Sequence, residues 1–453
     1  MAGETSSQAL FLHAKRLRCP NRSLNDLPDE ILLHILSFFP TLDAVTTSLI
    51  SRKWRLVWSL VPSLNFSYEL FPLAAGSYSD TNQAQFLADF VDHTLILRPD
   101  SHIHTFRLSF IFEKGYGIKV HTWIRCAVTR LKARQLHIDL FIYKRYHGHR
   151  DSWYYEFDFS LLRSGRVEVL RLTNCFLLLK SNISTMNLCS LRSIYFERVD
   201  LTDQMVWDLI LGCPNLEHLE LRSCLRLKNL VICSSRIKKL ALGYDYDIAL
   251  GYDYDSEAKN SIEIDCPNLC SLNFSDCNSA QFVLHEAPAL VEFCVDFACS
   301  TVKYFDLWSK IARLLEQAPH VEKLIVQNWW YKFLISKDPF PKDFVLNNLN
   351  HLELRTGYTQ YDLVGMAALL ALCPNVQTMV LDYTDKIKED ENLPEQLLNE
   401  VAFNIPKLKK VTMVAYTGTQ VQVDLVTILN RQGVKIELVS INFDDYNSYP
   451  CAV

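Results

Sequence analysis

Beyond residue 100, apolar side chains recur in one short pattern: an apolar residue, two others, an apolar residue, one other and an apolar residue. Two clear copies are Leu216/Leu219/Leu221 and Leu349/Leu352/Leu354. The last two apolar positions alternate with other residues, which predicts a half-buried β-strand. Copies begin at Ile103, Val167, Leu191, Leu216, Ile237, Leu269, Leu290, Val321, Leu349, Val376 and Leu408, with a degenerate copy at Leu136. Their spacing of about 21 to 34 residues is typical of solenoid repeats.

Proline occurs at a fixed distance from this pattern. It stands two residues before six copies, at Pro214, Pro267, Pro288, Pro319, Pro374 and Pro406. Because proline ends a helix and favours an extended residue before it, each one predicts a transition into a strand. Between copies, periodic apolar residues predict helices over 201–211, 305–315, 361–372 and 393–403. Intervals of only about 21 residues predict irregular returns instead.

A strand, a turn and a helix or loop, repeated at this period, predict a leucine-rich-repeat solenoid of the α/β class. Parallel strands then line its concave face, and helices or loops line its convex face. Cys175, Cys224 and Cys277 follow the pattern at the position where such repeats carry asparagine or cysteine, which predicts structural thiols rather than nucleophiles. The fourteen cysteines form no C-x-x-C pair and indicate free thiols in a reducing compartment.

Residues 24–62 follow a helical pattern instead. Apolar residues recur there at three- and four-residue steps, at Ile31, Leu32, Ile35, Leu36 and Phe39. Pro28 favours a helix start and Pro40 ends the helix. Thr41 is expected to cap a second helix, and a third begins near Ser51. Three helices in about forty residues bury too little apolar surface to be stable alone, so they cap the next domain or bind a partner.

The residues of this segment resemble an F-box. The resemblance is carried by Leu27-Pro28-Asp29-Glu30-Ile31-Leu32 and, further along, by Ser51-Arg52-Lys53-Trp54-Arg55 and Trp58. It implies binding to the Skp-type adaptor of a cullin-RING (SCF) ubiquitin ligase. The residues it assigns to adaptor binding are Leu27, Pro28, Ile31, Leu32, Ile35, Leu42 and Val45. Trp54 and Trp58 are expected to pack internally.

The following segments resemble plant F-box/leucine-rich-repeat proteins, some of which end in an FBD region. Residues 86–110 and 120–140 resemble the segment after the F-box, and residues 406–436 loosely resemble an FBD region. The domain prediction is a disordered tail (1–22), an F-box (23–68) and a linker with degenerate first repeats (69–165). Leucine-rich repeats (166–415) and a weakly FBD-like C-terminal cap (416–453) complete it.

The concave strand face is the predicted target-binding surface, since residues between the pattern's apolar positions point there by strand alternation. The predicted target-binding residues are Arg171, Tyr195, Glu220, Arg222, Glu353 and Arg355. The alternative is that these residues only solvate the face while loops make the contacts. The duplicated acidic, aromatic pentapeptides at 243–247 and 251–255 predict a surface loop, or a contact loop for a basic partner.

Composition narrows the function. The net charge of −5 argues against nucleic acid as a partner. The sequence carries no recognisable catalytic or metal-site motif, so no enzyme activity, metal or cofactor is predicted. The start of the chain does not resemble a signal peptide, and no apolar run is long enough to span a membrane. An intracellular, soluble protein of the nucleus and/or cytoplasm is expected.

The predicted function, which rests on the resemblance, is that of a substrate-recognition adaptor of an SCF ubiquitin ligase. One alternative is a leucine-rich-repeat scaffold with no ligase role. Another is a small-molecule (hormone) receptor of the same fold, which would need a basic cluster on the concave face. Arg171, Arg192 and Arg222 are the candidates for such a cluster, although Glu168, Glu217 and Glu220 lie among them in the sequence.

Overall fold

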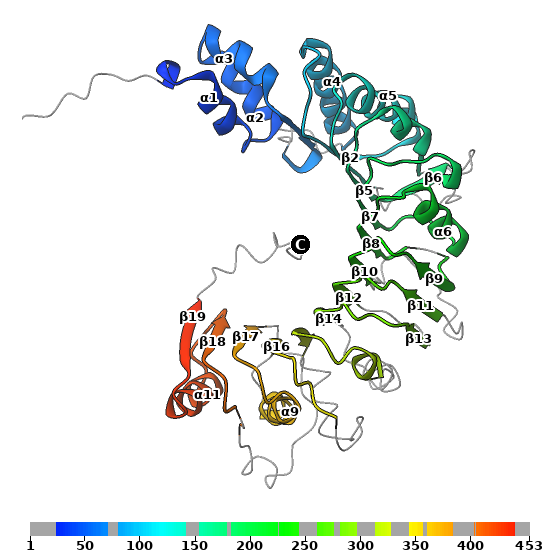
Figure 1. Cartoon of the computed structure of the whole chain (residues 1–453). Coiled ribbons are helices and arrows are strands. Elements are labelled where there is room, and N and C mark those ends of the chain that lie inside the picture. Colours follow the sequence, from blue (N-terminus) through cyan, green and yellow to red (C-terminus); the bar gives the residue numbers. More distant parts are fainter. Residues whose placement is uncertain are drawn as a thin grey trace, which may run out of the picture.

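The computed structural model shows an arc of parallel strands with three helices at its N-terminal end (Figure 1). It describes residues 24–70, 80–141, 154–178, 183–224, 226–243, 261–275, 281–296, 313–327, 344–356, 360–383, 403 and 405–439. The predicted N-terminal tail, the two acidic pentapeptides beyond residue 243 and Cys277 lie outside the described residues. None of the described helices is long and apolar enough to cross a membrane.

The N-terminal helices are α1 (Asp29–Leu36), α2 (Thr41–Thr46) and α3 (Arg52–Val57). Trp54 and Trp58 are buried, as predicted, in a small core that these helices build among themselves. The predicted capping role of Thr41 is wrong. Helix α2 begins at Thr41 itself, and the Thr41 hydroxyl instead accepts a hydrogen bond from the Asn65 N–H at 2.6 Å.

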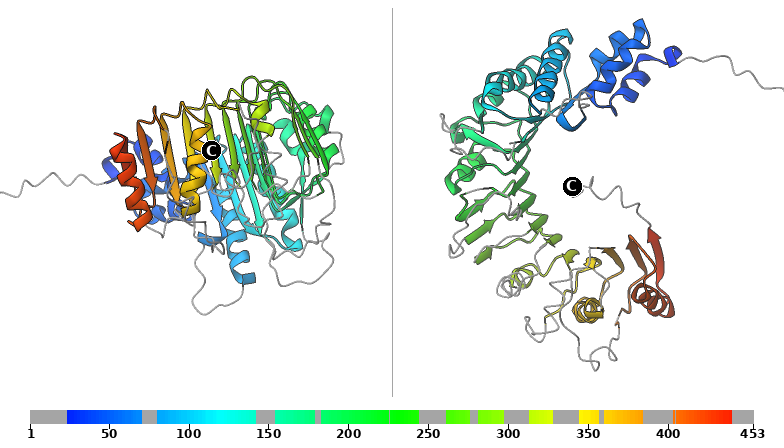
Figure 2. Two further views of the ribbon diagram at one scale, coloured as in Figure 1. Left: turned by 90° about the horizontal axis from the view of Figure 1, so that it is seen from below. Right: turned by 180° about the vertical axis from the view of Figure 1, so that it is seen from behind.

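The main sheet contains fourteen described strands, all parallel to their neighbours. In spatial order these are β1 (Ser63–Ser67), β2 (Thr105–Ile111), β3 (Gln135–Phe141), β5 (Val169–Thr173), β7 (Ser193–Glu197), β8 (His218–Arg222), β10 (Lys239–Gly243), β12 (Ser271–Ser275), β14 (Glu292–Asp296), β15 (Lys323–Gln327), β16 (His351–Thr356), β17 (Thr378–Tyr383), β18 (Lys410–Val414) and β19 (Lys435–Val439). The predicted solenoid fold is confirmed. Figure 2 shows the strands side by side along the arc, with the N-terminal helices beyond its first strand.

Helices cover the convex side of the sheet: α4 (Asp80–Leu97), α5 (Gly117–Arg125), α6 (Asp203–Gly212), α9 (Gln360–Ala371) and α11 (Gln420–Arg431) (Figure 1). The helices predicted over 201–211 and 361–372 are confirmed by α6 and α9. Most of the segment predicted as a helix over 305–315, and nearly all of 393–403, lie outside the described residues.

The prediction of irregular returns in the short intervals is wrong. A second sheet forms on the convex side from β9 (Asn229–Cys233), β11 (Ser261–Asp265) and β13 (Gln281–Leu284). A further pair consists of β4 (Tyr155–Asp158) and β6 (Cys175–Leu178). Alternating residues such as Leu230 and Ile232 are buried under the main sheet, so even a short return gains apolar burial by adopting an extended conformation.

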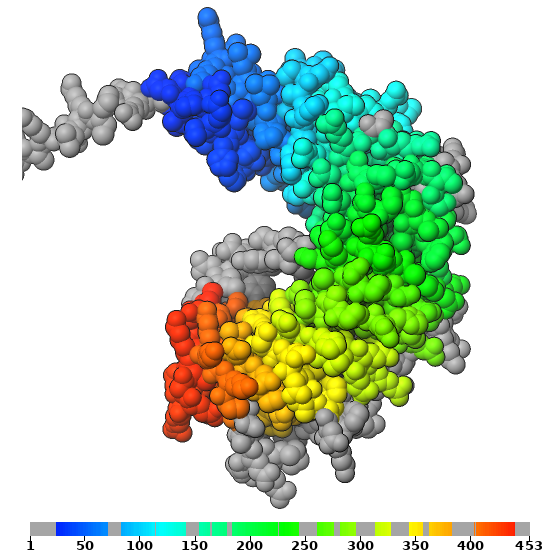
Figure 3. Space-filling view, viewed as in Figure 1, coloured from blue at the N-terminus to red at the C-terminus, as the bar shows by residue number. Residues whose placement is uncertain are grey.

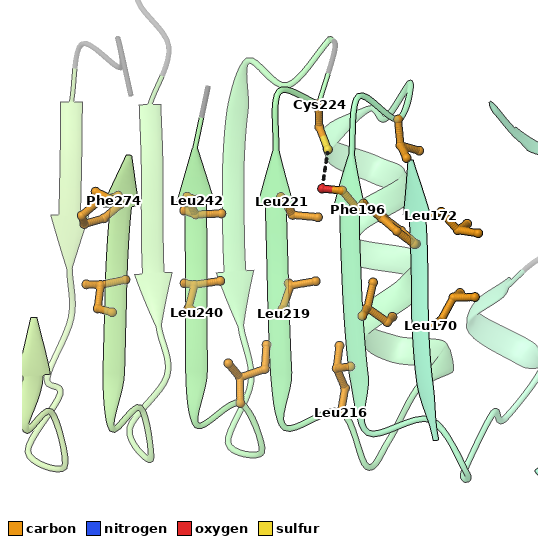
Figure 4. Packing of buried hydrophobic residues seen from close by; sticks show 14 of the residues in the cluster. Leu170, Leu172, Phe196, Leu216, Leu219, Leu221, Cys224, Leu240, Leu242 and Phe274 are labelled. Atoms are coloured by element: carbon orange, nitrogen blue, oxygen red, sulfur yellow. Dashed lines mark hydrogen bonds between the residues drawn. The ribbon is translucent and has the colours of Figure 1, made fainter. Parts of the chain in front are cut away.

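Alternation along each strand builds the core. In β8, Leu219 and Leu221 are buried while the residues between and beside them are partly exposed. Figure 4 shows the equivalent side chains of neighbouring strands stacked in rows on the convex side of the sheet. The Cys224 thiol lies among them and donates to the Phe196 carbonyl at 3.7 Å, the dashed contact of Figure 4. Each repeat thus shares its core with its neighbours.

The prolines that precede the pattern all occupy the same turn. The carbonyl of the residue before each proline accepts the N–H three residues on, as in Leu216 N–H to Cys213 and Val376 N–H to Cys373. Where asparagine follows the proline, its amide donates to a carbonyl of the preceding repeat. Asn215, Asn268 and Asn375 form such bonds at 2.9, 2.8 and 2.6 Å.

Replacing Asn375 with alanine should lower the free energy of unfolding by about 1 kcal/mol, because the Asn347 carbonyl loses its donor. Chemical denaturation of the wild type and variant measures this. Asn430, an exposed residue at the end of α11, offers the matched Asn430→Ala control with a change below about 0.5 kcal/mol. Equal stabilities of the Asn375→Ala variant and the wild type would show that the amide contributes nothing.

The helical module and the arc are joined by β1. This strand follows the third helix almost at once and pairs in register with β2, from Ser63 to Ser67. Buried Arg98, just after α4, donates from Nη2 to the Val61 carbonyl at the end of the module. Burial, and the nearby Arg130 cation, lower the pKa of Arg98 to about 10. The module is therefore fastened to the first repeats by a sheet ladder and by a buried guanidinium.

Candidate functional site

Two surfaces stand out, and the first is the outer surface of the three N-terminal helices. Apolar side chains there remain exposed although the module has a core of its own. They are Leu24, Ile31, Phe38, Phe39, Leu49, Ile50, Leu56 and Leu60. Leu49 is 81% exposed and Phe38 75%. Such a density of large apolar side chains on about forty residues marks an interaction surface.

The residues predicted to bind the adaptor divide into three groups. Pro28 and Ile31 are exposed, whereas Leu27, Ile35, Leu42 and Val45 are half-buried. Leu32 is fully buried, so its side chain stabilises the module and offers no surface to a partner. Sequence reasoning did not include Phe38, Leu49 and Ile50 in this surface. For Leu49 and Ile50 the available signal was their apolar character within the polar stretch of residues 46–53.

A hydrogen-bond network fixes the start of the module against α3. The Asn25 side-chain oxygen accepts from Trp54 Nε1 at 2.8 Å and from the Ser51 hydroxyl at 2.9 Å. Lys53 donates to the Asn25 carbonyl at 3.0 Å and pairs with Asp29 at 3.1 Å. These contacts hold the turn before α1 in place, so the exposed side chains on both sides of it are presented on a fixed backbone.

The second surface is the concave face of the sheet, which forms the inner side of the arc (Figure 3). Its middle line is a row of in-register residues, one from each strand, which we call the central row. The central row consists of Asn65, Arg107, His137, Arg171, Tyr195, Glu220, Ala241, Asn273, Cys294, Ile325, Glu353, Val380, Thr412 and Glu437. Charged residues gather towards its ends, while Ala241 to Ile325 carry no charge.

The predicted target-binding residues all lie on this face, and each has another of them as a neighbour. The Arg171 guanidinium lies over the Tyr195 ring, 3.6 Å from its centroid. Arg222 Nε and Glu220 Oε1 form an ion pair at 2.5 Å. Burial raises the pKa of Glu353, and the Lys323 and Arg355 cations oppose that shift. The strand alternation used in the prediction therefore placed these residues correctly on the face, but it does not test their role.

The basic cluster required of a small-molecule receptor does not form as predicted. Arg192 lies outside the strand register, before β7, and pairs with Glu217 at 3.2 Å, while Arg222 pairs with Glu220. Basic side chains instead converge nearer the N-terminal end, where Arg107, His137 and Arg171 adjoin one another in the central row. Sequence reasoning missed Arg107 and His137, which occupy the same pattern position as Arg171 in the first copies.

The cysteines that follow the pattern have no reactive environment. Cys175 and Cys224 are buried, and burial raises the pKa of the Cys224 thiol to about 12 and that of Cys175 further still. A thiol with so high a pKa stays protonated at neutral pH and is a poor nucleophile. Both cysteines are structural, as predicted. No group of three potential metal ligands occurs among the described residues.

The architecture is a three-helix module joined to a solenoid of parallel strands. Residues 24–66 match the F-box domain model, and residues 96–451 match the model described as At1g61320/AtMIF1, LRR domain. The second match covers more than half of the chain. The chain therefore belongs to the F-box/leucine-rich-repeat family with this type of repeat domain, and the resemblance seen in the sequence is confirmed.

Relatives from Arabidopsis thaliana share both parts. The putative F-box/LRR-repeat protein At3g18150 is 26% identical over 379 residues, which cover 82% of this chain and 74% of the relative. The F-box/FBD/LRR-repeat protein At2g26030 is 24% identical over 449 residues, 93% and 92% of the two chains. The combination supports the general role of an SCF substrate adaptor. The FBD-like character of the C-terminus and the domain boundaries stay predictions.

Proposed function

We propose that the chain binds a Skp-type adaptor through the exposed apolar side chains of α1 to α3, and a target protein on the concave face of the arc. The observation that carries the proposal is the outer surface of the module. Its core is already formed by Leu32, Trp54 and Trp58, yet Ile31 and Leu49 remain exposed. Burying them against a partner stabilises the complex by about 25 cal/mol per Å² of apolar surface.

This role requires no catalytic side chain of the chain's own. A ligase adaptor acts by holding its target close to a conjugating enzyme, which raises the effective concentration of the target there. The fixed junction at β1 suits this task, because the module and the arc share one hydrogen-bonded sheet. The central row mixes charged, polar and apolar side chains, which fits a polypeptide target whose own side chains are equally mixed.

Co-expression of the chain with plant Skp-type adaptors, followed by co-purification, tests the proposal. A stable complex that survives size-exclusion chromatography is the expected result. Failure to bind any of several adaptor paralogues would contradict adaptor binding, and the chain would then be a repeat protein whose helices only cap the arc.

A further inference from the structure

The N-terminal end of the concave face carries a cluster of basic side chains on three neighbouring strands. Arg107 on β2 is in register with His137 on β3, which is in register with Arg171 on β5. Neighbouring strands lie about 4.8 Å apart, so the backbones of the two arginines flank that of the histidine at about that spacing on either side. Arg107 is exposed, and the other two are partly exposed on the concave side.

The hydrogen bond between Arg107 and His137 fixes the tautomer of the histidine. Arg107 Nη2 lies 3.3 Å from His137 Nδ1. A guanidinium has only donors, so Nδ1 must accept and the ring proton must reside on Nε2. Burial, together with the Arg107 and Arg171 cations, lowers the pKa of His137 to about 3, so the ring is neutral at physiological pH.

The Nε2–H of His137 is consequently a donor that lacks an acceptor. Nε2 is buried and has no hydrogen-bond partner within the described part of the chain. Buried donors in folded proteins are almost always paired, with protein, water or ligand. Both neighbouring strands carry an arginine in register with His137, and both cations act on its ring. An acceptor that carries negative charge is therefore the partner that suits this donor best.

The two arginines are also uncompensated. Neither Arg107 nor Arg171 forms an ion pair with a carboxylate in the described ranges, whereas Arg192 and Arg222 each do. Arg171 stacks on Tyr195, which orients its planar guanidinium and leaves its N–H edge for other acceptors.

The nearest acidic groups on the face do not neutralise this cluster. Asp139 and Glu197 lie two residues further along their strands, in the next row of the concave face. Glu197 pairs with Arg198 at 3.4 Å. Burial and the Glu197 charge raise the pKa of Asp139 to about 6. The surroundings of Asp139 therefore disfavour its charged form, which makes it a poor counter-ion for the arginines.

We propose that Arg107, His137 and Arg171 form a binding site for one oxyanion, the carboxylate or phosphate group of an acidic side chain on the target polypeptide. The site supplies two cations and one neutral donor, which suit a single carboxylate or phosphate better than a polyphosphate. Tyr195, next in the row, holds the Arg171 guanidinium in place by stacking against it. This inference rests on the proposed function, since it assumes that the concave face receives the target.

Peptide binding to the purified full-length chain tests the site. The probes are fluorescent pools of randomised ten-residue peptides with a fixed central glutamate, phosphothreonine or glutamine, measured by fluorescence anisotropy. The glutamate or phosphothreonine pool should bind at least tenfold more tightly than the glutamine pool. The double variant Arg107→Gln/Arg171→Gln should lose that preference. Arg236→Gln, which changes an exposed arginine in the turn between β9 and β10, should retain it.

A pair of histidine variants tests the donor. His137→Gln retains an amide donor and should keep most of the preference, whereas His137→Leu should weaken binding of the acidic pool about tenfold. Equal binding of all three pools would overturn the proposal. So would a preference unchanged in the double variant, or tight binding of inositol hexakisphosphate with no preference among the peptides.

The two proposals fail separately. If no adaptor co-purifies but the acidic preference depends on Arg107 and Arg171, adaptor binding is wrong and the oxyanion site stands. If the adaptor binds and the acidic preference is absent, the oxyanion site is wrong and the adaptor role stands.

Discussion

Changing Ile31 and Leu49 together to aspartate is expected to abolish co-purification with a Skp-type adaptor while the arc stays folded. Both side chains are exposed, Leu49 at 81% and Ile31 at 47%, so neither change disturbs the core of the module. Position 31 lies in the first turn of α1, where the helix dipole stabilises a negative charge. Each buried apolar contact at the centre of an interface is worth about 2 kcal/mol, so affinity should fall by roughly a thousandfold.

Two controls separate binding from folding. Phe86→Asp changes a side chain of α4 that is 60% exposed and lies outside the module, so adaptor binding should be unchanged. Leu32→Asp buries a charge in the core of the module and should unfold the helices, which circular dichroism and limited proteolysis would detect. Full adaptor binding by the Ile31→Asp/Leu49→Asp variant would refute the assignment of this surface.

Phe274→Ala is expected to lower the free energy of unfolding of the arc by about 3 to 5 kcal/mol. Phe274, labelled in Figure 4, is fully buried. It lies on β12, near the middle of the strand order of the main sheet. Its ring contacts Phe293 on the neighbouring strand β14, with centroids 6.2 Å apart, and Phe282 on the convex strand β13, at 4.8 Å. The substitution therefore opens a cavity where two repeats and both sheets meet.

Hydrogen exchange tests this prediction better than thermal unfolding of the whole chain, because it shows which strands lose stability. In a solenoid each repeat contacts only its neighbours, so protection should fall mainly in β10 to β15 and much less in the N-terminal helices. Phe86→Ala, on an exposed site, should change stability by less than about 0.5 kcal/mol. A uniform loss of protection along the arc would show that the chain unfolds as one cooperative unit instead.

Alternation along the chain correctly predicted the buried residues of strands such as β8 and β16. Leu219 and Leu221, Leu352 and Leu354 all lie in the core, as their spacing requires. The prolines identified the turns before the strands, because the fixed φ angle of proline allows few local structures. The additional convex strands were not predicted, because a short apolar alternation inside a return has no proline or period to identify it.

The binding surfaces were harder to predict. Ile31 and Leu32 are adjacent and equally apolar, yet they differ by about 100° around the helix, so one is exposed and the other is buried. The sequence alone does not say which face the module's own core uses. Arg107 and His137 occupy the same pattern position as Arg171, so the pattern itself places them on the concave face. Their contact with each other was not predictable, because it depends on the pairing of strands about thirty residues apart, which only the sheet register reveals.

Because β1 joins the helical module to the sheet, the number of repeats sets the distance and the rotation between the module and any point of the central row. Each strand between the module and a given point of the central row adds about 4.8 Å of path along the sheet, and a fixed increment of rotation. In the proposed ligase, the lysines of a target that receive ubiquitin would therefore be selected by reach. Loss or gain of one repeat between the module and the bound target would redirect modification to other lysines, while the contact residues beyond that repeat stay the same.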